Sequence, residues 1–578
     1  MRAALATATD ALLAELGRKG HWEGELSASA LSTATAIVAL RQVDSKTHED
    51  LVEGGCRWLA QTQNGDGGWG DTIKSKSNIS TTALCWAALR GGDDADAFAV
   101  AIERAEAWLK RAAGSLEGLG AAIAARYGKD RTFSVPILMH LAICGRIDWK
   151  AVHSLPFELA ALPHQFFGAL QLPVVSYALP ALIAIGQVIH HFHPSRNPLV
   201  RSLRNAAIAR TLRVLESIQP TNGGFLEATP LTSFVTMALA AAGNREHPVA
   251  MKGAAFLRAS VRPDGSWPID TNLSTWVTTL SIKALAHQPA ALKPEQRLTL
   301  REWLVGQQYR VEHLYTHAAP GGWAWTDLPG GVPDADDTPG ALLALLHLGS
   351  VEPDTRAAGI AGVRWLLDLQ NRDGGIPTFC RGWGALPFDR SSPDLTAHTL
   401  RAWSAWLPQL AENEKQRVLR AIARAIAFLA RRQRADGSWL PLWFGNEHAP
   451  DDENPLYGSA KVVIALRELG DRGFDFPGEM LGRGCAYLAT SQNDDGGWGG
   501  IRGAPSTTEE TALAVEALAG TEHVGAVDRG SAWLVGQVES GSWKENAPIG
   551  FYFAKLWYYE RLYPMIWTVG ALGKVATL

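Results

Sequence analysis

A short pattern recurs along this chain and constrains its fold more than any other feature. In each copy an aromatic residue is followed 11 positions later by a tryptophan, and Asp-Gly-Gly or Asp-Gly-Ser stands directly before that tryptophan. The four strict copies span residues 58–69, 256–267, 428–439 and 487–498. Regular self-similarity of this kind indicates repeated supersecondary units.

Weaker copies lie between the strict ones. They run from Leu215 to Phe225, from Trp365 to Ile376 and from Trp533 to Trp543, and one that starts at Trp303 resumes at Trp323 after an insertion. We expect each copy to end a helix near a glutamine, to turn on a glycine of positive φ, and to fold its tryptophan back on the next element. The glutamines and tryptophans of the repeat are therefore predicted to be structural.

Apolar helical runs, such as residues 81–89 and 511–518, separate the copies, and almost no strand pattern occurs. The unit is thus a helix–turn–helix of roughly 45 to 60 residues, which buries its apolar face only by stacking on its neighbours. We expect an all-α fold, either a solenoid or double-layered α-barrels. At 578 residues the chain is long enough for two large domains.

Composition limits the partners and the cellular compartment that we expect for this chain. The net charge of −4 predicts no nucleic-acid partner. The five cysteines are far apart without a CxxC pair, which favours a reducing compartment over a zinc cluster or a disulfide framework. No sustained apolar run opens the chain, so we expect no signal peptide. The 22 tryptophans call for an explanation, as structural residues or as the lining of a cavity.

Three carboxylates, Asp334, Asp336 and Asp337, stand between Pro333 and Pro339, just after two tryptophans. Their mutual repulsion favours a proton on at least one of them at neutral pH. A protonated carboxyl beside aromatic walls can deliver its proton to a weak base. The alternative is a plain helix N-terminus, where aspartate is favoured by capping and by the helix dipole. Spacing alone leaves both interpretations open.

Residues 155–163 and 172–189 are apolar and interrupted by prolines, and His190, His191, His193 and five arginines follow. The second run is too short and too broken for a confident transmembrane span. An apolar patch with a basic flank favours a segment that dips into one leaflet from the cytoplasmic side, and a buried helix is the open alternative. No carboxylate or cysteine stands at ligand spacing to the histidines, so we expect no metal.

The Asp-x-Asp-Asp-Thr string at 334–338 and the repeat that ends in Gln, Gly and Trp together resemble the class II terpene cyclases, closest to the squalene–hopene cyclase branch. The resemblance extends from His21 to Pro564. It implies two α/α-barrel domains around a central apolar cavity. Residues 1–24 plus 273–578 would form the catalytic domain, and residues 25–272 the inserted one, with a membrane-facing segment at 155–215. A homodimer and a monotopic attachment to the cytoplasmic side of a membrane are further implications.

The resemblance also assigns roles to the acids. Asp336 matches the proton donor, and Asp334 and Asp337 match its flanking partners. His398, in Ser392-Pro-Asp-Leu-Thr-Ala-His398, matches a histidine that hydrogen-bonds the donor. As an imidazolium, His398 would support the anion left after proton transfer and so strengthen the acid.

Several aromatic residues match the family's cavity wall, where a ring face attracts a passing cation. They are Trp276, Trp325, Trp443, Tyr177, Phe379, Tyr552 and Tyr559. Glu227 stands where the family carries a Gln-Pro pair at the product end of the cavity. It would act as the terminal base or cap the following helix.

The implied reaction needs no cofactor. The acid protonates a terminal alkene, the tertiary cation is captured by successive double bonds, and deprotonation or water ends the cascade. Squalene and a hopene-type product are our leading expectation. The alternatives are a prenyl diphosphate or another polyprene with the same mechanism, and a non-catalytic lipid-binding toroid. We do not expect a class I terpene synthase or a protein prenyltransferase, because the sequence lacks the metal-binding motif that each of these enzymes requires.

Overall fold

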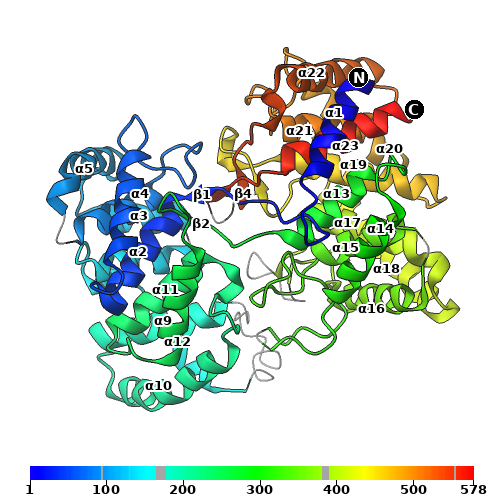
Figure 1. Cartoon of the computed structure of the whole chain (residues 1–578). Coiled ribbons are helices and arrows are strands. Elements are labelled where there is room, and N and C mark those ends of the chain that lie inside the picture. Colours follow the sequence, from blue (N-terminus) through cyan, green and yellow to red (C-terminus); the bar gives the residue numbers. More distant parts are fainter. Residues whose placement is uncertain are drawn as a thin grey trace.

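The computed structural model describes residues 1–92, 95–128, 130–163, 178–314, 316–349, 351–379, 389–551, 553 and 555–578. Two helical lobes lie side by side, joined by short strands (Figure 1). The first lobe contains residues 30–267, and the second contains the rest of the chain together with its N-terminal helix. The predicted all-α class is confirmed.

The first lobe contains α2 (Ala30–Asp44), α3 (Glu49–Gln61), α4 (Ile79–Arg90), α5 (Ala99–Ala113), α6 (Leu119–Tyr127), α7 (Arg131–Ile143), α9 (Leu179–Phe192), α10 (Pro198–Ile218), α11 (Thr229–Ala241) and α12 (Pro248–Ser260), with the short 3-10 helices η1 (Ala95–Phe98), η2 (Trp149–Ala151), η3 (Phe157–Ala161) and η5 (Phe225–Glu227). The strands β1 (Ala28–Ser29) and β2 (Trp267–Pro268) pair antiparallel at the junction of the lobes.

The second lobe contains α1 (Arg2–Ala14), α13 (Ser274–Leu285), α14 (Pro294–Gly306), α15 (Asp337–His347), α16 (Pro353–Leu369), α17 (Pro393–Trp406), α18 (Glu412–Arg432), α19 (Pro455–Asp471), α20 (Gly478–Thr490), α21 (Thr508–Leu518), α22 (Val524–Ser540) and α23 (Tyr563–Ala576), with η7 (Leu407–Gln409), η8 (Pro450–Asp452) and η9 (Ser542–Lys544). The strands β3 (Phe444–Gly445), β4 (Ile549–Phe551) and β5 (Leu556–Tyr558) form a small antiparallel sheet.

In both lobes buried helices form a closed inner ring. Within the described residues of the second lobe, α13, α15, α17, α19, α21 and α23 each pack on the next, and α23 returns to α13. In the first lobe the ring runs α2, α4, α7, α9, α11 and back to α2. Outer helices such as α18 and α22 bury one face only. Of the two predicted arrangements, the structure therefore has the double-layered α-barrel and not the solenoid.

The repeat builds the turns between outer and inner helices. In the strict copies the indole N–H donates to a carbonyl at the end of the preceding helix, as Trp498 Nε1 does to Leu488 O at 2.8 Å. The backbone N–H of Trp498 donates to Thr511 Oγ1 of the following helix at 2.9 Å. The tryptophan thus folds back on the preceding helix with its ring and on the next with its backbone, whereas the sequence predicted only the second contact.

Glutamine closes the same turn from the other side. Gln492 Nε2 donates to Gly496 O at 2.8 Å and to Ala526 O in the next outer helix at 3.0 Å. The same pair of bonds is made by Gln63, Gln219, Gln308, Gln370 and Gln433. Each amide thus bonds one carbonyl of its own turn and one carbonyl of the next outer helix, which fixes the turn against that helix. The structural role predicted for these residues is confirmed.

The lobes have separate hydrophobic cores. One core gathers residues from Ala30 to Trp267 together with Val332, and the other gathers Ala4 to Leu26 with residues between Ile269 and Leu572. Helix α1 packs on α22 and α23, so both ends of the chain lie in the second lobe (Figure 1). We propose domains at 1–24 plus 273–578 and at 25–272 on this basis.

The segment expected to face a membrane is described in part. Residues 164–177 lie outside the described residues. Residues 183–190 of α9 are buried, as the open alternative of a packed helix requires. Nearby, Leu162, Phe192, Leu199 and Leu203 are more than 40 % exposed. No described helix combines the length and the apolar character needed to cross a membrane.

Replacement of Trp498 by alanine tests the structural role of the repeat. Trp498 is fully buried, so we expect Trp498→Ala to destabilise the second lobe by about 3–5 kcal/mol. Thermal unfolding followed by circular dichroism gives the measurement. Trp533→Ala is the matched control, because this partly exposed indole bonds only Asp495 at the surface. An equal loss in both variants would contradict the assignment.

Candidate active site

The candidate site lies where the inner helices of the second lobe begin. Each outer helix reverses the chain, so the inner helices run in one direction and their N-terminal ends meet at one rim. Trp276 of α13, Asp336 before α15, Tyr457 of α19 and Tyr563 of α23 all lie at such ends. Helix N-termini carry partial positive charge, which suits a cluster of acids.

The three aspartates have different environments within that rim. Asp334 and Asp337 are 3 % and 2 % exposed, whereas Asp336 is partly exposed. The backbone N–H groups of Asp336 and Asp337 both donate to Asp334 Oδ1 at 2.8 Å. Asp334 therefore caps the start of α15, whereas Asp336 makes no side-chain cap. The helix-capping interpretation of the motif therefore holds for Asp334, whereas the Asp336 side chain stays outside the cap.

Burial raises the pKa of all three carboxyls, but not to the same extent. It raises the pKa of Asp334 to about 7, since the two backbone N–H bonds limit the rise. Burial raises the pKa of Asp337 well above its usual value, and the charge of Asp334 raises it further. The pKa of Asp336 is also raised well above its usual value, by burial first and then by Asp334 and Asp394. Burial therefore favours the protonated form of Asp336, and among the three side chains that of Asp336 is the accessible one.

His398 lies beside the motif, but it is not the imidazolium that the resemblance implied. Burial lowers its pKa well below the usual value, and the cations Arg401 and Lys461 lower it further. Its ring bonds the backbone of Asp336, and Nε2 has no hydrogen-bond partner among the described residues. His398 is thus a neutral ring that holds the backbone of the acid, and the expectation of a cationic His398 is wrong.

A continuous chain of aromatic rings lies in the same lobe as the acid. Trp325 and Phe379 have ring centroids 6.3 Å apart, and Phe379 and Trp443 are 6.0 Å apart. The chain continues through Phe551, Tyr558, Tyr563 and Trp567 to Tyr457. The raised pKa values of Tyr457 and Tyr558 both include a contribution from the charge of Asp336. The acid and the rings therefore share one neighbourhood.

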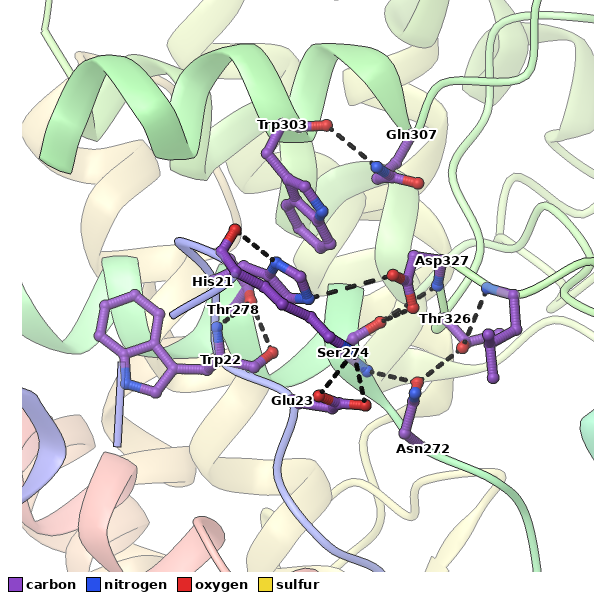
Figure 2. A network of polar contacts seen from close by, with 12 residues as sticks. His21, Trp22, Glu23, Asn272, Ser274, Thr278, Trp303, Gln307, Thr326 and Asp327 are labelled. Carbon is purple, nitrogen blue, oxygen red and sulfur yellow. Dashed lines mark hydrogen bonds and ion pairs between the residues drawn. The ribbon is translucent and has the colours of Figure 1, made fainter. Parts of the chain in front are cut away.

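Polar contacts hold two of these tryptophans. The N–H groups of Thr275 and Trp276 donate to the carbonyl of Trp325, and Trp276 Nε1 donates to Tyr563 Oη at 2.9 Å. Figure 2 shows the network behind them: Ser274 Oγ donates to Asp327 Oδ1 at 2.8 Å, and the ring of His21 stacks on Trp303. The N-terminal segment is thereby fixed against the loop that carries Trp325.

Tyr559 lies away from the aromatic chain. Lys74 Nζ is 5.4 Å from its ring centroid, and Arg262 is another charged neighbour. Side chains alternate along an extended chain, so Tyr558 at the end of β5 points toward Phe551 and the following residue, Tyr559, points the other way. Tyr559 therefore does not join the aromatic chain as expected, whereas Tyr558 does. Tyr177 and Tyr552 lie outside the described residues.

The side chain of Glu227 is buried at the junction of the lobes and bonds residues on both sides of it. It is fully buried, and Oε1 accepts from Asn222 Nδ2 and from the N–H of Gly330, both at 2.7 Å. Oε2 accepts from Thr271 Oγ1 at 3.1 Å. The helix that follows, α11, has Ala228 at its N-cap without a side-chain bond. Both expected roles, terminal base and helix cap, are wrong, because the carboxylate is occupied by partners distant in sequence.

Sequence reasoning missed two charged residues near the site. Asp270 is partly exposed beside Trp325, and burial raises its pKa well above the usual value. Lys461 lies one turn after Tyr457, with Nζ 5.1 Å from that ring's centroid. A lysine in the apolar run 459–466 is the signal that could have identified Lys461. Nothing in the local sequence distinguishes Asp270.

No group of three or more histidine, cysteine, aspartate or glutamate side chains suitable for a metal ion occurs among the described residues. The acids at the rim instead bond backbone N–H groups and one another. The chemistry that this arrangement offers is proton donation from an accessible carboxyl into aromatic surroundings.

Comparisons with known proteins identify the family of the chain. Residues 272–577 match the squalene-hopene cyclase C-terminal domain, and residues 5–178 match the N-terminal domain. A probable squalene–hopene cyclase of Sinorhizobium fredii is 26 % identical, over 97 % of this chain and 95 % of its own. A drimenyl diphosphate synthase of Streptomyces showdoensis is 28 % identical over 48 % of this chain and 46 % of its own.

Among solved structures, the ent-copalyl diphosphate synthase from Streptomyces platensis shares the fold, with a TM-score of 0.55, 18 % identity and 99 % coverage of both chains. That identity is low enough for the likeness to concern the fold alone. The domain matches cover more than half of the chain and include the acid motif and the aromatic chain. The chain therefore belongs to the squalene–hopene cyclase family of class II terpene cyclases.

Proposed function

We propose that this enzyme cyclises a linear isoprenoid, squalene in the first instance, to a polycyclic hopene-type product. The observation that carries the proposal is the partly exposed Asp336 in the neighbourhood of an aromatic chain, with a raised pKa that favours its protonated form. The family of the chain and its near full-length match to a squalene–hopene cyclase support squalene as the substrate.

In this mechanism the Asp336 carboxyl donates its proton to the terminal alkene. The neighbouring Asp334, already an acceptor of two N–H bonds, keeps the shared negative charge away from Asp336 before the transfer. Ring faces of Trp325, Phe379 and Trp443 then stabilise the cation as it moves along the folded chain. Water must be excluded while the cation lasts, and a wall of packed rings serves that purpose.

A prenyl diphosphate is the second candidate substrate, because one relative of 28 % identity is a drimenyl diphosphate synthase. The same Asp336 chemistry applies to its terminal alkene. A non-catalytic lipid-binding toroid is the alternative of another class, and it gives no role to the raised pKa values of the aspartates at the rim.

We also propose a peripheral attachment to the cytoplasmic side of a membrane, which supplies an apolar substrate. The exposed side chains Leu162, Phe192, Leu199 and Leu203, which we call the α10 patch, support it. Four exposed arginines, Arg196, Arg201, Arg210 and Arg213, flank the patch and suit anionic headgroups. A homodimer is expected from the family alone.

Purified protein incubated with squalene in detergent is expected to yield a cyclised triterpene, detected by gas chromatography with mass spectrometry. Turnover should persist with EDTA, since protonation by a carboxyl requires no metal ion. Geranylgeranyl diphosphate and farnesyl diphosphate are the parallel substrates. Conversion of a diphosphate with none of squalene would replace the leading substrate by the second, and no conversion of any would reject cyclase activity on these classes.

Asp336→Asn is expected to abolish turnover, by at least about 1,000-fold, because an amide has no acidic proton to give. The fold should persist, since the Asp336 side chain makes no cap bond. Product yield and thermal unfolding are measured together, with Asp368→Asn, an exposed carboxyl of α16, as the control. Near-normal turnover of a folded Asp336→Asn enzyme would exclude this residue as the donor.

The double variant Leu199→Glu/Leu203→Glu is expected to lose most binding to phosphatidylglycerol vesicles, because two carboxylates oppose both the apolar contact and the anionic surface. Vesicle co-sedimentation measures it. Val100→Glu/Leu298→Glu places the same charges on exposed apolar residues elsewhere and serves as the control. The α10 patch is not the membrane contact when both double variants bind alike.

A further inference from the structure

Charged side chains fill the interior of the second barrel below the rim. Lys283 of α13 pairs with Glu516 of α21 at 2.9 Å, and both are under one-fifth exposed. Arg401 of α17 pairs with Glu468 of α19 at 2.6 Å, and Arg401 is buried. Buried ions of this kind need partners, because removal from water is costly for each of them. Both pairs meet that requirement.

Lys461 belongs to the same cluster but has no such partner. It shares one face of α19 with Tyr457, one turn before it, and with Glu468, two turns after it. Within the part of the chain that the structure describes, it forms no ion pair. Three cations therefore face two anions, and the surplus positive charge stands on the lysine nearest the rim.

Charged groups from several inner helices act on Lys461. Lys283 of α13, Arg401 of α17, Glu516 of α21 and Asp336 at the rim all affect its pKa, and its ammonium lies over the ring of Tyr457. His287, His347 and His398 feel the charges of Lys283 or Arg401 in the same cluster, but burial lowers their pKa values first and they remain neutral. Of the two carboxyls that act on Lys461, Glu516 pairs with Lys283, whereas Asp336 has no ion pair among the described residues.

We propose that Lys461 is the cation that supports Asp336 as it gives up its proton, the role that His398 does not fill. Lys461 acts through Asp336 and does not touch the substrate. Its positive charge stabilises the carboxylate that Asp336 becomes after proton transfer. The proposal rests on the proposed function of Asp336 as the initiating acid.

The electrostatics have a definite sign. Lys461 lowers the pKa of Asp336, which burial otherwise raises, and so makes it a stronger acid while still protonated. Burial, followed by repulsion from Lys283, lowers the pKa of Lys461 itself to about 7. As the pH rises through that value, Lys461 loses its charge, Asp336 becomes a weaker acid, and turnover should fall.

Three proteins separate the roles: wild type, Lys461→Arg and Lys461→Met. Arginine keeps the charge at every pH used, and methionine keeps the apolar stem that packs on Tyr457. Initial rates with the substrate that wild type converts are measured from pH 5 to 9, with thermal unfolding at each pH. Lys555→Met is the matched control, because that lysine pairs with Asp452 away from the acid.

We expect a wild-type rate that declines around pH 7. Lys461→Met should lose roughly 10-fold or more in kcat with KM unchanged, and should lack this decline. Lys461→Arg should retain most activity and carry it to higher pH. Lys555→Met should follow wild type.

A folded Lys461→Met enzyme with the rate and pH profile of wild type would overturn the proposal. So would an arginine variant as impaired as the methionine one, because a structural role needs shape and not charge. Failure of the wild type to convert any isoprenoid would instead reject the proposed function, so the two failures are distinguishable.

Discussion

Desolvation of the Asp336 carboxyl is the interaction on which the rest of the site depends. A carboxyl in water is ionised at neutral pH and has no proton to give. At the rim of the second barrel, burial and two neighbouring acids raise its pKa well above the ordinary value. The same burial removes the charge from His398, so the support for the carboxylate has to come from another residue. Burial therefore favours the protonated form of Asp336 and also leaves its neighbour His398 uncharged.

The fold supplies that environment through its turns. Indole and amide side chains of the repeat satisfy the ends of the outer helices, which lets the inner helices close into a ring with every N-terminus at one rim. Backbone N–H groups at the start of α15 then hold Asp334 and leave the Asp336 side chain accessible. Structural tryptophans and catalytic geometry are thus linked: the first determine where the helix that follows the acid begins.

Local sequence was sufficient for features whose partners are close in the chain. The repeat predicted helices, turns and the structural role of Gln492 and Trp498, because each bond there spans a single turn or an adjacent helix. The Asp334–Asp337 spacing likewise predicted a proton-holding cluster. Local sequence was not sufficient for Glu227, because its partners Thr271 and Gly330 lie far away in the chain. It was not sufficient for the charge of His398 either, which burial and cations distant in the sequence determine. Tyr559 was misplaced because a one-residue difference on a strand reverses the face.

The protonation state of Asp336 is the central claim, and infrared difference spectroscopy measures it without any substrate. The spectrum of wild type minus Asp336→Asn at pH 7 isolates the carboxyl that the substitution removes. The account predicts a band from the C=O stretch of a protonated carboxylic acid, because burial raises the pKa of Asp336 well above its usual value. A difference spectrum that contains the carboxylate bands and lacks the acid band would contradict it.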